Sequence, residues 1–294
     1  MPTCTQTSQL MKRLGIDRAL EIIKDAGYDA YDFSMGCMIY EENCIFNGPD
    51  YLKEAKRIRK VADALGIPCH QAHAPFHSSL PDTPENKEYN ATIFGKIVRS
   101  MEIAATLGAR YVVVHPVQHL DFLSNMEKLK ELNLEFYHSL QPYAEKFGIR
   151  IAVENMWQRN PIGGHIVDSV CARPEDFVEM IDALDPRFFV ACLDVGHAVL
   201  CSHDPAEVVR ALGHDRLHSL HVHDVDGIGD LHTIPFLAKT DWQSFADALR
   251  EIRYDGHITL EADGFLKGMP DEILPEAEKL MARTARYLAD QCEN

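Results

Sequence analysis

Long apolar runs are absent from this sequence. No stretch of its 294 residues approaches the roughly 20 consecutive apolar residues that a membrane-spanning helix needs. The opening residues, MPTCTQTSQLMKRLG, do not follow the charged-then-apolar order of a secretory signal peptide. We therefore expect a cytoplasmic protein that does not associate with membranes.

Paired cysteines are also missing. The eight cysteines stand singly along the chain, and no Cys-x-x-Cys pair occurs. A chain of this length buries a large core and does not depend on disulfide cross-links, whereas a zinc ribbon needs closely paired thiolates. The cysteines are therefore predicted to be reduced thiols.

Positive charge is scarce. The chain holds 29 Lys and Arg residues against 45 Asp and Glu residues, which gives a formal net charge of -16. A surface this acidic repels nucleic-acid phosphates at long range. The composition therefore disfavours a general nucleic-acid-binding protein, although it does not exclude a local basic groove.

Short β-rich segments alternate with amphipathic helical segments from end to end. The predicted strands are 3–6, 30–34, 68–72, 111–115, 149–154, 189–194, 219–223 and 257–261. Helical patterns lie between them, among them 16–27, 51–66, 95–109, 127–148, 174–184, 204–213 and 241–252. Segments such as RYVVVHP and RIAVEN are apolar throughout, as parallel strands covered on both faces are. Eight strand–helix units without a linker predict an α/β fold, a single (β/α)8 TIM barrel over residues 1–294.

The predicted helix ends agree with this organisation. Pro174 and Pro205 stand in first turns and are followed by acidic residues, which suit the positive end of a helix. Glycines follow several last apolar turns, as C-terminal caps do: Gly27, Gly66, Gly108, Gly148 and Gly213. The alternative is a doubly wound open sheet. Such a sheet normally carries a glycine-rich nucleotide turn after an early strand, and none is found here.

Carboxylates and imidazoles stand at the ends of the predicted strands. In chain order they are His73, His115, Glu154, Asp194 with His197, His221 with His223, and Glu261. Strand C-termini of a barrel meet at one mouth, where TIM-barrel active sites lie. Each residue taken alone could be a helix cap or a hydrogen-bonded core residue. Together, three carboxylates in one cavity would repel one another without a cation, so the set predicts a bound divalent metal.

The segment HVHDVDGIGDLH, residues 221–232, belongs to the same mouth. His221 and His223 share one face of a strand end, because side chains alternate along a strand. Two glycines then break the strand into a loop that carries Asp230 and His232. A solvated turn is the simpler interpretation of such a cluster taken alone, and for Asp224 and Asp226 we still expect solvent-exposed or structural roles.

The ligand types narrow the choice of metal. Two Glu, one Asp and one or more His form a hard site of mixed oxygen and nitrogen ligands, which suits one ion of Mn²⁺, Mg²⁺, Co²⁺ or Zn²⁺. Cysteine is not expected to contribute, because Cys192 stands two residues before Asp194 and deeper in the barrel.

The ordered set Glu154, Asp194-Val-Gly-His197, His221-Val-His-Asp, Asp230-Leu-His and Glu261 resembles the xylose isomerase-like TIM-barrel superfamily. This superfamily includes ketose 3-epimerases, hydroxypyruvate isomerases, inosose dehydratases and endonuclease IV. The resemblance implies a metal-dependent sugar isomerase or epimerase that acts on a ketose or related polyol-ketone through a metal-stabilised enediolate.

The resemblance also implies roles for individual residues. The metal would be held by Glu154, Asp194, His221 and Glu261, and His197 would touch the substrate. Glu154 and Glu261 would act as the acid and base, one taking a proton and the other returning it. One departure lies in the mouth: HTIPFLAKTDW replaces a Pro-Gly-x-Gly turn of many isomerase members, which bears on substrate identity more than on metal binding.

The sharpest alternative is an abasic-site nuclease. His73, His115, Asp230 and His232 resemble the additional ligands that give endonuclease IV a trinuclear zinc centre, and Phe76 could be imagined as a wedge into DNA. The mouth loops, however, are poor in the Lys and Arg that neutralise phosphates.

A small sugar or polyol is therefore the preferred partner. Arg159 and Lys267 are the basic exceptions in the mouth loops, and His197, His165 and Trp157 offer substrate contacts. His223, Asp230 and His232 would contact the substrate or support the ligands. An inosose-type dehydratase and a non-catalytic sugar-binding barrel stay open, as does a homo-oligomer.

Overall fold

Eight parallel strands close into a barrel in the computed structural model, which describes residues 1–76 and 78–293. The barrel strands are β1 (Thr3–Gln6), β2 (Ala30–Ser34), β3 (Cys69–His73), β4 (Tyr111–Val114), β5 (Arg150–Glu154), β8 (Phe189–Asp194), β9 (Leu217–His221) and β10 (Ile258–Leu260). Each strand pairs with the next along the chain, and β10 returns to β1. The seam between β9 and β10 is closed by Val222, whose amide donates to the Thr259 carbonyl at 2.8 Å. The predicted (β/α)8 TIM barrel is confirmed.

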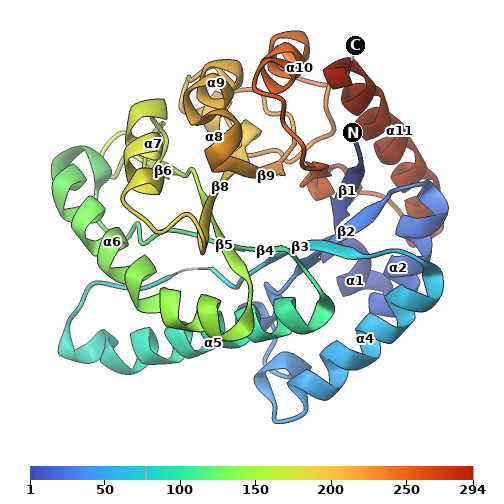
Figure 1. Ribbon diagram of the computed structural model, residues 1–294, viewed down its shortest axis with the longest axis horizontal. Coiled ribbons are helices and arrows are strands. Elements are labelled where there is room, and N and C mark those ends of the chain that lie inside the picture. The colour runs from blue at the N-terminus through green and yellow to red at the C-terminus, as the bar shows by residue number, and fades with distance from the viewer. Residues whose placement is uncertain (77, 294) are drawn as a thin grey trace.

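Helices surround the strands on all sides (Figure 1). They are α1 (Ser8–Leu14), α2 (Ile16–Ala26), α3 (Cys37–Tyr40), α4 (Tyr51–Leu65), α5 (Lys87–Leu107), α6 (Phe122–Phe147), α7 (Pro174–Asp182), α8 (Val195–Leu200), α9 (Pro205–Arg216), α10 (Trp242–Glu251) and α11 (Leu274–Glu293). Short 3-10 turns are η1 (Ile45–Asn47), η2 (Pro84–Asn86), η3 (Asp263–Leu266) and η4 (Asp271–Ile273). A separate antiparallel hairpin pairs β6 (Trp157–Arg159) with β7 (Ile166–Asp168).

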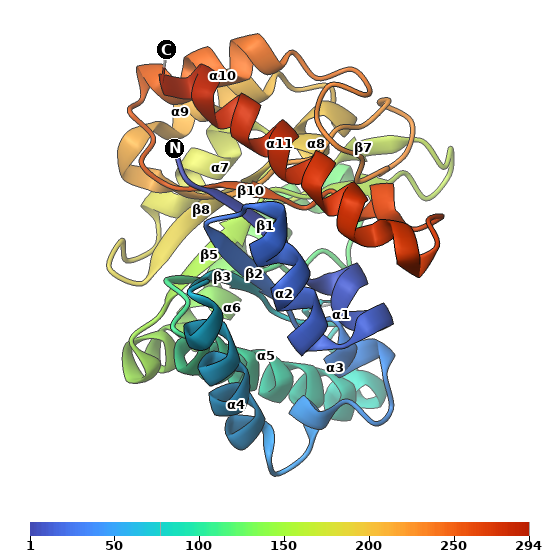
Figure 2. The ribbon, with the colours of Figure 1, turned by 90° about the vertical axis from the view of Figure 1, so that its right-hand side faces the viewer.

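The last helix completes the wall where the chain begins. Helix α11 packs against α2 and α10 and contacts β1 and β10, so the two chain ends lie side by side (Figure 2). The N-terminal ammonium of Met1 pairs with Glu293. No helix in the described part of the chain is long and apolar enough to cross a membrane.

Most predicted elements lie where the pattern places them. Strands β1, β2 and β8 have the predicted limits, and the other barrel strands differ by one or two residues. Strand β9 ends at His221 because the backbone beyond it leaves β8, and Val222 pairs with β10 alone. Four of the five predicted glycine caps adopt the left-handed conformation that ends a helix. At Gly213 the regular helix also breaks, with φ at 67°, but helical turns resume after it, so this glycine forms a kink in α9, which ends at Arg216.

The barrel interior holds a small apolar layer beneath the mouth. It consists of Tyr111, Val113, Ala152, Val190 and Cys192. Burial raises the pKa of the Cys192 thiol to about 11, so this sulfur stays protonated at neutral pH. The candidate metal-ligand groups in residues 1–76 and 78–293 contain no cysteine.

Candidate metal centre and active site

Four side chains from four consecutive strands of the barrel meet at its mouth. Glu154 ends β5, Asp194 ends β8, His221 ends β9, and Glu261 follows β10. All four are buried, and one ligand atom of each lies within 4.8 Å of the others. We call them the first ligand group. These are the residues for which the sequence predicts a shared divalent ion, and the structure brings them together.

The donor set of the first ligand group fits a divalent cation. Nδ1 of His221 lies 2.7 Å from Glu154 Oε1 and 3.3 Å from Glu261 Oε2. On the other side of the same ring, Nε2 lies 3.4 Å from Asp32 Oδ2. One imidazole thus stands among three buried carboxylates, an arrangement that a cation stabilises. Oxygen and imidazole nitrogen ligands suit Mn²⁺, Mg²⁺, Co²⁺ or Zn²⁺.

The pKa values of the two glutamates of the first ligand group are shifted in opposite directions. Burial raises the pKa of Glu154, but the positive charges of His221 and His115 outweigh it and hold that pKa well below its usual value. Burial also raises the pKa of Glu261, and here the neighbouring histidines do not fully compensate. Carboxyl groups whose pKa values are pushed apart are suited to act as base and acid in one site.

Asp194 is held from two sides before any metal binds. Its Oδ1 accepts the His197 amide at 2.6 Å, so it caps helix α8, and the Asn155 side chain bonds the Asp194 backbone at 2.7 and 2.9 Å. Nε2 of His223 lies 3.0 Å from Oδ1. Burial raises the pKa of Asp194, but His197 and His223 outweigh it and lower the pKa to about 2. The carboxylate is therefore ionised and oriented.

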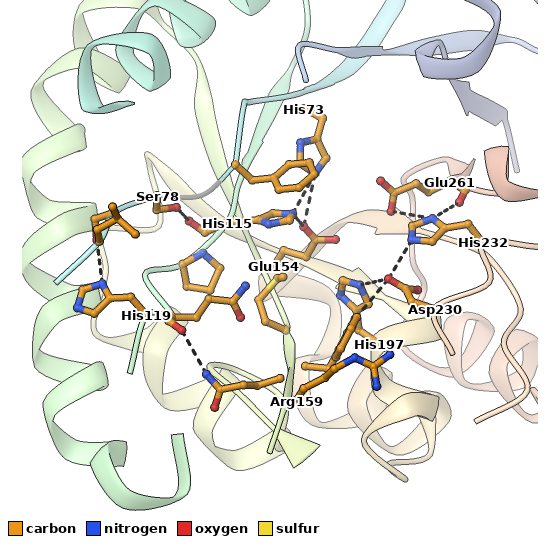
Figure 3. A pocket seen from close by; sticks show the side chains of 18 of the residues that line it. His73, Ser78, His115, His119, Glu154, Arg159, His197, Asp230, His232 and Glu261 are labelled. Carbon is orange, nitrogen blue, oxygen red and sulfur yellow. Dashed lines mark hydrogen bonds and ion pairs between the residues drawn. The ribbon is translucent and has the colours of Figure 1, made fainter. Parts of the chain in front are cut away.

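A second ligand group lies beside the first and consists of His197, His223, Asp230 and His232. Asp230 Oδ2 lies 3.2 Å from His232 Nε2 and 3.7 Å from His197 Nε2. The indole of Trp157 donates to the same oxygen at 3.3 Å. Figure 3 shows Asp230 between the two imidazoles. The predicted loop residues Asp230 and His232 therefore do join a strand-end histidine.

Three histidines of the mouth share a fixed tautomer. In each, Nδ1 donates to a backbone carbonyl, because a carbonyl oxygen can only accept. The pairs are His73 with Ala74 at 2.7 Å, His197 with Asn155 at 2.9 Å and His232 with Glu261 at 2.8 Å. When these rings are neutral, each Nε2 offers a lone pair, as it does in metal-binding histidines held by a carbonyl.

His73 and His115 meet at Glu154 (Figure 3). Their Nε2 atoms lie 3.1 Å apart, and Nε2 of His115 lies 2.8 Å from Glu154 Oε2. His73, Glu154 and His221 also have ligand atoms within 4.8 Å of one another, which defines a third ligand group. The additional histidines named from the sequence thus surround the first ligand group.

The pKa values of His197 and His232 are raised by the carboxylates around them, so these rings hold protons that a metal cation would replace. Burial lowers the pKa of His197, but Asp194 and Asp230 outweigh it and raise the pKa to about 10. The same balance, with Asp230 and Glu261 as partners, raises the pKa of His232 well above its usual value. Without a metal, protons on these rings supply the positive charge that the buried carboxylates need.

A cavity of about 590 Å³ opens above the ligand groups. Its wall includes Phe76, Met156 and Trp157, and its outer end carries His119 and Arg159. The Phe76 ring stacks on His115 with centroids 4.9 Å apart. This contact makes Phe76 part of the cavity wall and does not support the idea of a wedge into DNA.

The prediction of a substrate contact from His165 is not supported. His165 is exposed in the turn of the β6–β7 hairpin. It does not belong to the cavity wall, which the first strand of the hairpin supplies through Trp157 and Arg159.

A second cavity of about 410 Å³ lies on the other side of the same histidines. The two cavities share His73, Phe76, His232 and Glu261. Lys12 and Lys267 line the second cavity. Lys267 is expected at the mouth from the sequence, whereas Lys12 is not, because it lies on α1 and not at a predicted strand end.

Structural roles are confirmed for the two remaining aspartates of residues 221–232. Asp224 is fully buried and accepts hydrogen bonds from the backbone amides of residues 238–240 and from the Trp242 indole. Asp226 accepts from the amides of Ile228 and Gly229 in the exposed turn. Neither residue belongs to a ligand group.

Two polar residues below the mouth, Gln6 and Asp32, are not among those expected from the sequence. Gln6 at the end of β1 donates to Glu261 Oε1 at 2.8 Å, and Asp32 within β2 faces His221. Asp32 lies on the same strand face as Ala30 and Ser34 in AYDFS, because side chains two residues apart point to the same side of a strand. An acidic residue on a face of small residues is the signal that could have identified it.

Solved structures of similar fold exist for nearly the whole chain. A D-tagatose 3-epimerase-like protein has a TM-score of 0.70 at 24% identity, over 96% of this chain and 99% of that one. The IolI protein with a zinc atom has a TM-score of 0.72 at 18% identity, over 99% of this chain and 98% of that one. At these identities the likeness establishes the fold.

Sequence relatives match most of the chain. An uncharacterized protein of Methanocaldococcus jannaschii is 26% identical over 249 residues, which make up 83% of this chain and 78% of the relative. The model of the xylose isomerase-like TIM barrel family matches residues 20–291, from within α2 to within α11. The chain therefore belongs to the xylose isomerase-like TIM barrel family.

Proposed function

We propose that the protein is a metal-dependent sugar isomerase or epimerase that acts on a ketose or a related polyol-ketone. The observation that carries this proposal is the first ligand group, in which Glu154, Asp194, His221 and Glu261 converge from four strand ends. One divalent ion, of Mn, Mg, Co or Zn, would be held there. The D-tagatose 3-epimerase-like neighbour and the zinc atom of the IolI structure support the same assignment.

The metal, when bound, supplies positive charge that polarises a substrate carbonyl and makes the neighbouring C–H more acidic. The chain supplies the proton transfers. Glu154 is kept ionised by His115 and His221 and is the candidate base. Glu261, whose pKa is raised by burial, is the candidate acid. Gln6 holds Oε1 of Glu261 and so orients that carboxyl.

The place where the proton returns decides the outcome. Return to the same carbon on its other face gives an epimer, and return to the neighbouring carbon gives an isomer. Loss of a neighbouring hydroxyl instead gives the inosose-type dehydration. His197, His232 and Trp157 line the cavity beside Glu154 and Glu261, where they would bind substrate hydroxyls and fix the reacting carbon.

Hydrogen exchange with solvent tests the proposal. Metal-loaded protein is incubated in D2O with a panel of ketoses and polyol-ketones, and deuterium at the carbon next to the carbonyl is followed by NMR. We expect exchange with the native chain and its loss in Glu154→Gln and in Glu261→Gln. Two variants that keep metal and full exchange would contradict these roles, and sugar binding without exchange would indicate a non-catalytic sugar-binding barrel.

The second candidate is a phosphoester hydrolase with several metal ions, related to abasic-site nucleases. It is favoured by the three ligand groups and by the fixed tautomers of His73, His197 and His232. It ranks second because the two cavities are lined by three Lys and Arg residues, Lys12, Arg159 and Lys267, on a chain of net charge -16. Phosphate backbones need more neutralising contacts.

Elemental analysis and a cleavage assay separate the two candidates. One ion per chain with exchange of a ketose proton supports the sugar enzyme. Three zinc ions per chain with salt-sensitive cleavage of an abasic duplex would reverse the ranking. We further propose that the protein acts in the cytoplasm on a small sugar or polyol, without nucleic acid or membrane as partner. Gel filtration would test whether the protein forms a homo-oligomer.

A further inference from the structure

Two thiols face each other in the loop between β2 and α4. Sγ of Cys37 lies 2.8 Å from Sγ of Cys44. Cys37 begins α3, and Cys44 directly precedes η1. All cysteines of the described chain are free thiols, so this contact is a dithiol and not a disulfide.

Hydrogen bonds from helix α5 and from within the loop hold the two thiols in place. Lys96 of α5 donates to the Met38 carbonyl at 2.6 Å, and the Asn47 side chain donates to the same oxygen at 3.0 Å. Arg99 of α5 donates to the carbonyls of Phe46 and Asn47 at 3.0 and 2.7 Å. The backbone is thus fixed next to both cysteines, and their meeting does not depend on a chance loop conformation.

The surroundings of Cys44 make it the more reactive thiol. Its hydrogen-bond contact with Cys37 lowers the pKa of Cys44, with help from the Phe46 and Asn47 amides and against the effect of burial. The lower pKa favours the thiolate, the form that attacks oxidants. Cys44 is 7% exposed, which favours a small oxidant over a large one.

Cys37 connects the pair to the mouth of the barrel. It lines the second cavity together with Tyr40 and Glu41. His232 and Glu261 line the same cavity. A small molecule that enters this cavity therefore reaches the dithiol from the solvent side.

We propose that Cys37 and Cys44 are a redox modification site that closes to a reversible disulfide, with hydrogen peroxide as the oxidant. The Cys44 thiolate attacks one peroxide oxygen, the O–O bond breaks, and a sulfenic acid and hydroxide form. The Cys37 sulfur then attacks the Cys44 sulfur. The S–O bond breaks, the Cys37 proton leaves with the hydroxyl as water, and the two sulfurs are joined.

The electrons balance because the two thiols lose two electrons and peroxide gains them. A dithiol reductant reverses the reaction by thiol–disulfide exchange. This site does not depend on the proposed sugar chemistry.

The test combines mild peroxide treatment of the folded full-length protein with alkylation and peptide mass mapping. We expect the native chain to lose two hydrogen atoms in mass, to yield one linked peptide pair containing Cys37 and Cys44, and to regain both alkylatable thiols after dithiothreitol. Cys44→Ser should form no such link.

Cys201→Ser is the control, because Cys201 is partly buried, as Cys37 is, but burial raises its pKa to about 12; this variant should form the link like the native chain. Far-UV circular dichroism checks that each variant folds. If Cys44→Ser does not fold, the peptide mapping of the native chain alone tests the proposal. Full alkylation of both Cys37 and Cys44 after peroxide treatment, or a link between other cysteines, would overturn the proposal.

Discussion

Asp32 shows how one buried residue prepares the candidate metal centre. It lies inside the barrel, fully buried, and its Oδ2 accepts the Gln71 amide at 2.9 Å. The same oxygen faces Nε2 of His221. A carboxylate on one ring nitrogen fixes a metal-binding histidine so that the other nitrogen faces the metal. We therefore expect Asp32, whose Oδ2 lies 3.4 Å from Nε2, to orient Nδ1 of His221 towards Glu154 and Glu261.

Replacing Asp32 by Asn should weaken metal binding without unfolding the protein. Loss of such a supporting carboxylate typically lowers metal affinity by about 10–100-fold. Competition with a chelator measures the affinity, and thermal melting checks the fold. Asp226→Asn is the control, because Asp226 is a partly exposed carboxylate that belongs to no ligand group and should leave the affinity unchanged. Equal affinity of Asp32→Asn and the native chain would refute the role of Asp32.

At the scale of elements, helix α8 depends on one close approach. A Cβ on Gly196 would lie 2.1 Å from Cε1 of His223. Only glycine lets this helix pack directly on the imidazole that contacts Asp194. The glycine of the Asp-Val-Gly-His motif is thus required by packing against the second ligand group.

Gly196→Ala should destabilise the protein and weaken metal binding, because His223 must move away from Asp194. Helix propensity by itself favours alanine over glycine, so a loss of stability would point to the steric effect. Gly95→Ala is the control, since a Cβ at that position in α5 meets nothing within 4 Å and should be neutral or stabilising. If both variants melt alike and bind metal alike, the close approach is unimportant.

The same elements show how far the sequence predicts the fold and the site. Strand β8 is apolar throughout and ends in Asp194, so its limits and its ligand follow from the pattern alone. Helix α8 escapes detection because its apolar residues continue those of β8 without a break. The meeting of Asp230 with His197 depends on how the loop after β9 folds over the mouth, and no local spacing encodes that contact. Asp32 escapes because it stands within a strand instead of at its end.

For the molecule as a whole, the metal is expected to contribute to stability. The first ligand group brings three carboxylates and one imidazole into the buried mouth, and a ligand bound only by the folded state raises its stability. Removal of metal with a chelator should lower the melting temperature, and re-addition should restore it. Asp194→Asn and His221→Ala should melt at a lower temperature than the metal-loaded native chain and should not respond to metal. A native chain whose melting is unaffected by chelator and metal would contradict a bound ion.

A second property of the whole molecule lies far from the mouth, in the wall that α11 builds over β1 and β10. Glu278 of α11 is 1% exposed. Burial raises the pKa of its carboxyl from 4.5 to about 8, with a partial offset from Tyr28. The folded state therefore holds a proton that the unfolded chain releases near its ordinary pKa. The resulting stability is fully present below pH 4.5 and is lost as the pH rises through about 8.

Glu278→Gln removes this ionisable group while keeping its size. We expect the variant to melt several degrees above the native chain at pH 9, where native Glu278 must carry a buried charge, and to show no such gain at pH 4.5, where it is neutral. Glu276→Gln is the control on the same helix, because Glu276 is exposed and pairs with Lys279, and it should show no gain that grows with pH. Calorimetric melting of the three proteins between pH 4.5 and 9 provides the measurement. A constant difference between Glu278→Gln and the native chain across this range would mean that the Glu278 carboxyl has the same pKa in the folded and unfolded states, and so that burial under α11 does not raise it.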